Sequence, residues 1–205
     1  MSEHGEKLTV FGAGGHARSV IALLQSIQKE VVAVLDPAPR AGEHILGVPV
    51  YPCENAVLSD HSLVLAIGDN RERAAKLQQF ASAVYRWPLI HASAEVHRCA
   101  QLGPASQCFA GCYIGPEVKL GQNNLINTRA ILEHEVQIGD HNHLSVAAVL
   151  LGRVTIGSFC FIGAGAVIRD SVSICDGVTI GANAYVVKSV TEPGVYVGVP
   201  ARKIS

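Results

Sequence analysis

A hexapeptide repeat occupies the second half of the sequence. An aliphatic residue, or in one case Cys108, stands at every sixth position from Ile90 to Val186, which gives seventeen hexads ending at Thr191. A period of six fits neither an α-helix nor a two-faced strand. It fits a chain that turns after each hexad, buries one aliphatic residue inside at each corner and closes a coil with three sides. The sequence therefore predicts a parallel β-helix of between five and six coils, in which each coil is buried only against its neighbours.

A second inward position follows four residues after each of these aliphatic residues. It holds a small or β-branched residue in most hexads, and the exceptions are Ser106, Asn124 and Asn142. Glycine often follows the aliphatic residue directly, as at Gly139 and Gly157, where a turn favours a residue without Cβ.

The composition of the 205 residues, 49% apolar and 16% charged, predicts a soluble globular protein. A formal net charge of −1 gives no electrostatic basis for binding nucleic acid or an anionic membrane. The polar start, and the lack of about 18 consecutive apolar residues, argue against a signal peptide and against membrane insertion, so we expect a cytoplasmic protein. The six cysteines form no CxxC pair and are expected to be free, buried thiols.

The start of the chain predicts a strand, a glycine turn, a helix and a second strand. We expect strands at 8–11 and 31–36 and a helix over 17–27, where apolar residues recur at helical spacing. Gly12, Gly14 and Ala17 fit the pattern G-x-G-x-x-G/A, and Asp36 follows about twenty residues later, as in dinucleotide-binding folds. Only about 85 residues precede the repeat, too few for both halves of such a fold. A mononucleotide moiety is therefore favoured over NAD.

The passage after Asp36 is rich in Pro and Gly and is expected to be loop and short edge structure, before a third strand at 63–67 and a helix over about 71–81. Ligands of open α/β sheets bind at the carboxyl ends of the parallel strands, which predicts a nucleotide site there. The candidate residues are Gly14, Gly15, His16, Asp36 and Gly68. The alternative is that these glycines only permit tight turns. We thus predict a small Rossmann-like α/β domain over 1–86 and an all-β helix over 87–205.

Histidines and carboxylates are concentrated in the middle of the repeat, in the segment LEHEVQIGDHNH. His134 takes an outward position between Glu133 and Glu135, and a carboxylate can fix the tautomer of an imidazole and increase its basicity. A histidine with such a partner can act as a general base. His143 could donate a hydrogen bond to a bound carbonyl. Solvation on the surface is the alternative for both residues and the favoured interpretation for His141.

Three segments together resemble one family over essentially the whole chain: GAGGH near the start, LEHEVQIGDHNH in the repeat and VYVGVPARKI at the end. The family is that of the left-handed β-helix acetyltransferases that modify nucleotide-linked amino sugars. It includes enzymes acting on UDP-linked 4-amino-4,6-dideoxy sugars in bacillosamine synthesis, and perosamine N-acetyltransferases. The left-handed sense of the coil is implied by the resemblance alone. So are acetyl-CoA as the cosubstrate, the absence of a metal, a homotrimer with a site at each interface, and transfer to the C4 amino group of a nucleotide-linked sugar, with UDP favoured.

The resemblance also implies roles for the matching residues. His134 would be the general base and Glu135 its orienting acid, His143 would contact the acetyl group, and Asn127 would contact the sugar. The nucleotide would lie on the turn and strand ends named above. The backbone positions along acetyl-CoA would be Gly152, Ala164 and Ala182, with Arg202 and Lys203 near its phosphates. Pro37 stands where the family pattern has another acid, which leaves the nucleotide base and the sugar open.

Three other functions stay open at this stage. O-acetylation of sialic acid would use the same base on a hydroxyl group. A zinc protein similar to the γ-carbonic anhydrases would use His134, His141 and His143 as ligands. A non-catalytic nucleotide-sugar-binding protein would need none of these side chains for chemistry.

Overall fold

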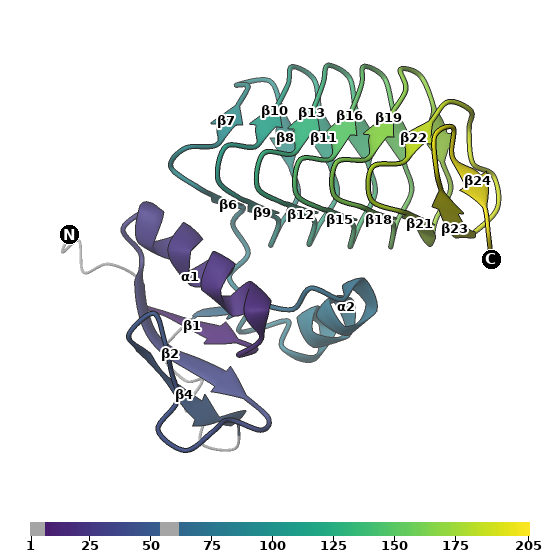
Figure 1. Ribbon diagram of the computed structural model, residues 1–205. Helices are drawn as coiled ribbons and strands as arrows, with labels where there is room; N and C mark the ends of the chain where they lie inside the picture. Colours follow the sequence, from purple (N-terminus) through teal and green to yellow (C-terminus); the bar gives the residue numbers. More distant parts are fainter. Residues whose placement is uncertain (1–6, 54–61) are drawn as a thin grey trace. The chain divides into compact units, whose positions relative to one another are not determined.

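The computed structural model describes residues 7–53 and 62–205. The chain divides into two compact units, Met1–Arg86 and Trp87–Ser205, and each has its own sheets and its own core (Figure 1).

The first unit contains a five-stranded sheet in the order β3-β4-β2-β1-β5. Its strands are β1 (Lys7–Phe11), β2 (Glu30–Asp36), β3 (His44–Ile45), β4 (Val48–Pro52) and β5 (Ser62–Leu65). Strand β1 pairs in parallel with β2 and β5, and β2 pairs in parallel with β4, whereas β3 is an antiparallel edge strand on β4. The passage after Asp36, which was expected to be loop and short edge structure, thus contributes the parallel strand β4. The side chains of Val48 and Val50 on this strand are buried in the core of the unit.

Two helices follow strands of this sheet. Helix α1 (Gly15–Ser26) begins two residues earlier than expected and buries one face, which includes Val20, Ile21 and Leu24. Helix α2 (Asn70–Gln79) begins where the Asp69 carboxylate accepts the backbone N–H of Glu72 at 2.8 Å, an N-cap that satisfies one of the free donors of the first turn. Both helices start at the carboxyl ends of parallel strands, so their N-termini lie at that edge of the sheet.

The second unit is a β-helix in which seventeen short strands fall on three sides. We call these the first side (β7, β10, β13, β16, β19, β22), the second side (β8, β11, β14, β17, β20) and the third side (β6, β9, β12, β15, β18, β21, extended by β23 and β24). Each strand pairs in parallel with the strand one coil away, three hexads along the chain, as Tyr113 pairs with Ile131. The side chains therefore stack in columns that run through all coils.

The strands and their bounds are β6 (Leu89–Ile90), β7 (Glu95–Val96), β8 (Gln101–Leu102), β9 (Gln107–Cys108), β10 (Tyr113–Ile114), β11 (Lys119–Leu120), β12 (Leu125–Ile126), β13 (Ile131–Leu132), β14 (Gln137–Ile138), β15 (His143–Leu144), β16 (Val149–Leu150), β17 (Thr155–Ile156), β18 (Phe161–Ile162), β19 (Val167–Ile168), β20 (Ser173–Ile174), β21 (Val178–Ile180), β22 (Tyr185–Val186), β23 (Gly194–Val197) and β24 (Arg202–Lys203).

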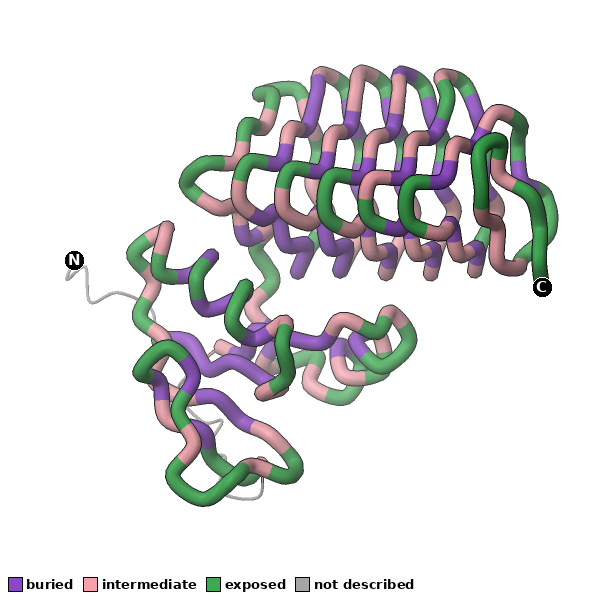
Figure 2. Tube along the Cα trace, in the orientation of Figure 1, coloured by how far each residue is buried: buried purple, intermediate pink, exposed green. Residues whose placement is uncertain are grey.

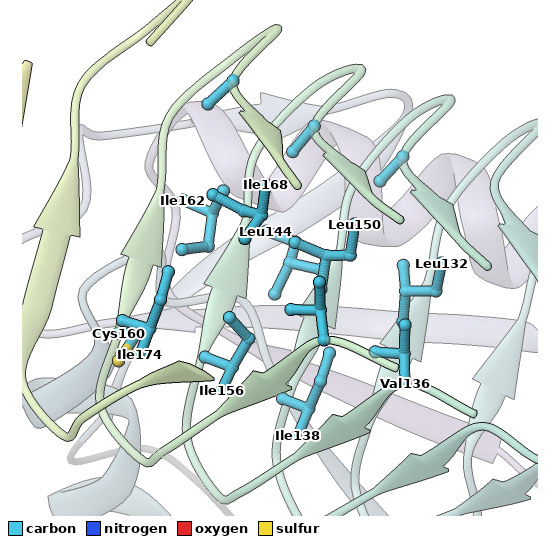
Figure 3. Close-up of a cluster of buried hydrophobic side chains, with 14 of the residues drawn as sticks. Leu132, Val136, Ile138, Leu144, Leu150, Ile156, Cys160, Ile162, Ile168 and Ile174 are labelled. Carbon is cyan, nitrogen blue, oxygen red and sulfur yellow. The ribbon is translucent and has the colours of Figure 1, made fainter. Parts of the chain in front are cut away.

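The sixth-position residues line the flat sides of the coil. Figure 3 shows Leu132, Leu150 and Ile168 stacked from one side and Ile138, Ile156 and Ile174 from another. Their partners four residues on, such as Val136, fill the corners (Figure 3). The prediction that the aliphatic residues sit at the corners is therefore wrong in detail. The alternation of buried and exposed residues along each coil follows the same pattern (Figure 2).

Close approach of the next coil explains the repeated glycines. A Cβ at Gly139 would lie 2.8 Å from the carbonyl oxygen of Gly157, so no larger residue fits. The left-handed residue of a turn comes two positions later, and in many turns it is not a glycine, as at Glu135 (φ 61°) and His141 (φ 59°).

Ser106, Asn124 and Asn142 stack inside the corner between the second and third sides, one coil apart. The Asn124 side chain accepts the backbone N–H of Asn142 at 2.8 Å, and Asn142 accepts that of Cys160 at 2.7 Å. The side-chain amide of Asn142 donates to the carbonyl of Gly157 at 2.9 Å. These exceptions to the apolar pattern form a satisfied internal ladder, as buried polar groups must.

All six cysteines lie in the described ranges and carry free thiols. Cys108, Cys112 and Cys160 are buried inside the coil, as expected, whereas Cys99 is exposed and Cys53 and Cys175 are half-buried. Burial raises the pKa of Cys160 to about 11, so this thiol stays protonated and packs as a small apolar side chain.

Candidate active site

His134 lies in the turn between β13 on the first side and β14 on the second side. Its Nδ1 is 2.9 Å from Oε2 of Glu135, and the two side chains are 44% and 48% exposed. An ionised carboxylate accepts, so this contact requires the hydrogen on Nδ1 and leaves Nε2 as the basic atom. The pair therefore has the arrangement of a general base with an orienting acid, open to solvent or substrate.

The imidazole of His134 lies directly against Gly152, one coil further along the same corner. A Cβ on Gly152 would be 2.5 Å from both Cε1 and Nε2 of the ring and 3.0 Å from Oδ2 of Asp170. The backbone of Gly152 does not have a left-handed φ, so the glycine is needed for space. The His134 ring thus packs against the backbone of Gly152, in the space that a side chain would fill.

A chain of charged groups continues from Glu135 along this corner. Arg153 lies in the coil after Glu135, and its Nη1 is 3.8 Å from the same Oε2 that contacts His134. Its Nη2 donates to both carboxylate oxygens of Asp170 at 3.0 and 2.8 Å. The hydrogen bond from Ser171 and the ion pair with Arg153 hold the pKa of Asp170 below its usual value. Sequence reasoning missed Arg153 and Asp170, although the spacing of three hexads, one full coil, from Glu135 to Arg153 could have identified the first of them.

His143 and Asn127 lie together on another part of the coil. His143 points outward from β15 on the third side, and its Nε2 is 3.2 Å from Nδ2 of Asn127. The ring packs edge-on against Phe161, with the ring centres 5.2 Å apart. Because the third side lies opposite the corner that carries His134, the two histidines face away from each other within one chain.

His141 lies at another corner of the triangle, between the second and third sides. Its ring stacks on Phe159 with centroids 4.9 Å apart, and its Nδ1 lies 2.9 Å from Nδ2 of Asn123. The three histidines therefore point away from different parts of the triangle. Among residues 7–53 and 62–205, no group of three or more His, Cys, Asp or Glu side chains is arranged to hold a metal ion.

The other candidate positions for acetyl-CoA are divided in the same way. Gly152 belongs to the His134 corner, whereas Ala164 and Ala182 are exposed residues stacked at the corner between the third and first sides, where Asn127 also lies. Arg202 and Lys203 form β24 at the C-terminal end, where Lys203 is paired with Glu192 at 3.0 Å.

The glycine turn of the first unit contains two different kinds of glycine. Gly12 has a left-handed φ of 104°, and a Cβ there would lie 3.0 Å from the carbonyl oxygen of Ala66, so the fold itself requires it. Gly14 and Gly15 have neither a left-handed φ nor any atom within 4 Å of an added Cβ. Both are exposed, at the start of α1, where no side chain caps the helix and no acidic residue lies in the first turn. Their open backbone can approach a phosphate closely.

Both carboxylate oxygens of Asp36 accept backbone N–H groups of nearby turns. Its Oδ2 accepts the backbone N–H of Ala13 at 2.8 Å, and its Oδ1 accepts that of Ala38 at 2.9 Å. The carboxylate therefore ties the end of β2 to the glycine turn after β1. Gly14, Gly15, Asp36 and Gly68 all follow the carboxyl ends of parallel strands, as expected, and His16 lies in the first turn of α1.

The turn that contains Gly68 is held by Arg73, a residue that the sequence did not single out. The guanidinium of Arg73 is fully buried and donates to the carbonyls of Ile67 and Gly68, both at 3.2 Å. Burial lowers the pKa of Arg73 to about 10, which leaves the group charged at neutral pH. A buried cation of this kind fixes the turn at the sheet edge.

The full length of the chain matches a solved sugar acetyltransferase. It is 31% identical to GDP-perosamine N-acetyltransferase from Caulobacter crescentus, determined with CoA and GDP-perosamine, over 100% of this chain and 98% of the other, with a TM-score of 0.92. The chain belongs to the left-handed β-helix sugar N-acetyltransferases. This membership confirms the expected fold class, including the hand of the coil, and the expected enzyme class.

Other comparisons agree with this family assignment. The acetyltransferase domain of PglB from Neisseria gonorrhoeae is 28% identical over 98% of this chain and 100% of its own, with a TM-score of 0.90, and was also determined with acetyl coenzyme A. WeeI from Acinetobacter baumannii shares the fold, with a TM-score of 0.79 at 22% identity over 97% of this chain and 100% of its own. The PglD N-terminal domain family matches residues 7–80 and the bacterial transferase hexapeptide family matches residues 153–188. No curated protein sequence gives a significant match.

In the parts of the acetyltransferase that the structure describes, neither helix has the length and apolar character needed to cross a membrane.

Proposed function

We propose that this acetyltransferase transfers the acetyl group of acetyl-CoA to the C4 amino group of a nucleotide-linked 4-amino-4,6-dideoxy sugar, with His134 as the general base. The observation that carries the proposal is the contact between His134 Nδ1 and Glu135 Oε2, because it directs a basic Nε2 outward at the corner of the coil. The relatives with CoA and GDP-perosamine, or with acetyl coenzyme A, support the two substrate classes.

The reaction needs one proton acceptor and one site for developing negative charge. Nε2 of His134 takes a proton from the amine, whose nitrogen attacks the carbonyl carbon of the thioester. The charge that develops on the carbonyl oxygen needs a donor, such as the backbone N–H of Gly152 or an N–H of His143. The C–S bond then breaks and the thiolate leaves. The neutral Nδ1–H tautomer, stabilised by Glu135, suits the first of these steps.

We propose that the site is completed by a second copy of the chain, as in a homotrimer. Two observations support this. His134 with Gly152, and His143 with Asn127, lie on opposite parts of the coil. In addition, the outward residues of the first side form an apolar, half-buried column of Tyr113, Ile131, Val149, Val167 and Tyr185, whereas the second side carries exposed polar residues. A continuous apolar column on a surface favours self-association.

The nucleotide is proposed to lie on the first unit, at Gly14, Gly15, His16, Asp36 and Gly68. Backbone N–H groups at the start of a helix such as α1 are suited to phosphate, and the absence of internal crowding at Gly14 and Gly15 is explained by a ligand that needs the space. Within this role Asp36 holds the turn in shape. Acetyl-CoA is proposed to contact Gly152, Ala164, Ala182 and His143, with Arg202 and Lys203 near its phosphates.

The experiment that tests this function is a thiol-release assay with acetyl-CoA. The acceptors are UDP-, GDP- and dTDP-linked 4-amino-4,6-dideoxy sugars, with free sialic acid as the O-acetylation control. We expect release of CoA with at least one nucleotide-linked amino sugar, with the UDP form favoured by the family resemblance and the GDP form by the 31% identical relative. The acetylated position is identified by NMR of the product. Turnover of sialic acid alone would contradict N-acetylation.

A further inference from the structure

The corner that carries His134 contains an ion-pair network spanning three coils, and this network sets the context of the proposed base. Glu135 Oε2 has two partners, Nδ1 of His134 at 2.9 Å and Nη1 of Arg153 at 3.8 Å. In the next coil, Asp170 binds Arg153 through two hydrogen bonds, and Ser171 accepts from Nε of Arg153 at 3.3 Å. Hydrogen bonds therefore hold Nε and Nη2 of the guanidinium, and Nη1 lies within ion-pair distance of Glu135.

We propose that Arg153 is a positioning residue for the His134–Glu135 pair. Held by Asp170 and Ser171, its charge keeps the Glu135 carboxylate in the position where it accepts from Nδ1 of His134. The arginine thereby selects the tautomer that leaves Nε2 free to accept a proton from the amine. This inference rests on the proposed role of His134 as the base.

The geometry explains why an arginine is suited to this place. Its planar guanidinium can bind one carboxylate with two hydrogen bonds while a separate nitrogen faces another carboxylate. Here Nη2 binds Asp170, Nε faces Ser171 and Nη1 faces Glu135, and a lysine, with a single nitrogen, could not reach all three partners. Glu135 is 48% exposed, so without Arg153 its side chain is free to leave His134 for water. Without an acceptor at Nδ1, a neutral histidine is no longer held in the Nδ1–H tautomer.

The test uses the full-length protein labelled with ¹⁵N-histidine and measures the tautomer of His134 by NMR, with the signal assigned from its loss in His134→Gln. We expect the Nδ1–H form in the unchanged protein and a shift of the majority to the Nε2–H form in Arg153→Ala. Arg153→Lys should retain part of the Nδ1–H population. The matched control is Arg129→Ala, which removes an arginine with almost the same backbone conformation (φ 57° against 59°) from a different corner and should leave the tautomer unchanged.

Kinetics with the acceptor found in the thiol-release assay provide the second readout. We expect Arg153→Ala to lower kcat about tenfold, less than loss of the base itself, with both KM values within about twofold. A His134 tautomer that does not respond to Arg153→Ala would overturn the inference whether or not a sugar acceptor is found. A raised KM for acetyl-CoA with unchanged kcat would also overturn it and make Arg153 a cofactor contact. If His134→Gln is fully active, the proposed base fails independently of these outcomes.

Discussion

Two neighbouring turns of the same coil show how one backbone can place a histidine beside charged groups or beside an aromatic ring. The turn with His134 and the turn with His141 each contain a left-handed residue, Glu135 and His141, with φ of 61° and 59°. Both turns lie at corners of the same triangle, and both histidines are partly exposed. The two turns are therefore equivalent, but the histidines are offset by one residue, because His141 is itself the left-handed residue and His134 precedes Glu135.

The neighbours in the adjacent coils make the difference. His134 rests on a glycine and contacts a carboxylate that is itself paired with an arginine. His141 stacks on Phe159, and Asn123 lies beside its Nδ1. The first environment places the Cε1–Nε2 edge of the ring beside a residue without a side chain and gives Nδ1 a carboxylate partner. The second holds the ring between an aromatic face and a neutral amide, which immobilises it without adding charge.

The largest expected effect comes from replacing each histidine in turn. His134→Asn should lower kcat by roughly 10²- to 10⁴-fold, the usual contribution of a general base. His141→Asn removes the same ring but tolerates the left-handed backbone, so kcat should change by less than about twofold. Steady-state kinetics with the accepted sugar, and melting curves for both variants, make the comparison. Equal losses of kcat in the two variants would show that the corners do not differ in function.

Much of this contrast was visible in the sequence. The period of six predicts the coil, and the segment LEHEVQIGDHNH indicates the coil in which the proposed base lies. The carboxylate partner of His134 is its chain neighbour, so the local pattern is sufficient to predict it. The outward position of the ring follows from its place in the hexad.

The contacts between coils were harder to predict. Gly152, Arg153 and Asp170 meet His134 and Glu135 only because three hexads return the chain to the same corner, so their roles depend on register as well as on residue type. The same spacing relates Ser106, Asn124 and Asn142, which a six-residue pattern records only as three exceptions. In the first unit, Arg73 was missed because an exposed arginine and a buried one look alike in a helix of mixed polarity.

The second prediction replaces Gly152, the residue against which the His134 ring packs. Gly152→Ala places a methyl group where Cε1 and Nε2 of the ring now lie, so the imidazole must move away while the backbone N–H of residue 152 is kept. We expect kcat to fall about a hundredfold, since displacement of a catalytic group by about 1 Å can have that effect. The melting temperature should change little, because the ring is partly exposed and can move into solvent.

The control variant changes Phe159, the residue on which the His141 ring stacks. Phe159→Leu loosens the stacking of His141 and should leave kcat unchanged, since this aromatic contact has no part in the proposed proton transfer. If Gly152→Ala retains full kcat, the reaction does not need the His134 ring in its present position against Gly152. Of the features that distinguish this corner from that of His141, only the contact with Glu135 would then matter for kcat.

The smallest effect on the reaction, and a purely structural one, is expected at the corner that contains His141. Asn142 is completely buried there, and it satisfies the N–H of Cys160 and the carbonyl of Gly157 through its side chain. Asn142→Ala leaves both backbone groups without these partners inside the coil, which should lower the free energy of unfolding by about 3 kcal/mol. Gln137→Ala, an exposed amide in the same coil, should change it by less than about 0.5 kcal/mol. Chemical denaturation measures both values, and kcat of folded Asn142→Ala should equal that of the unchanged protein. A loss of kcat at full stability would mean that this corner contributes to catalysis, and that the chemistry extends beyond the turn that carries His134.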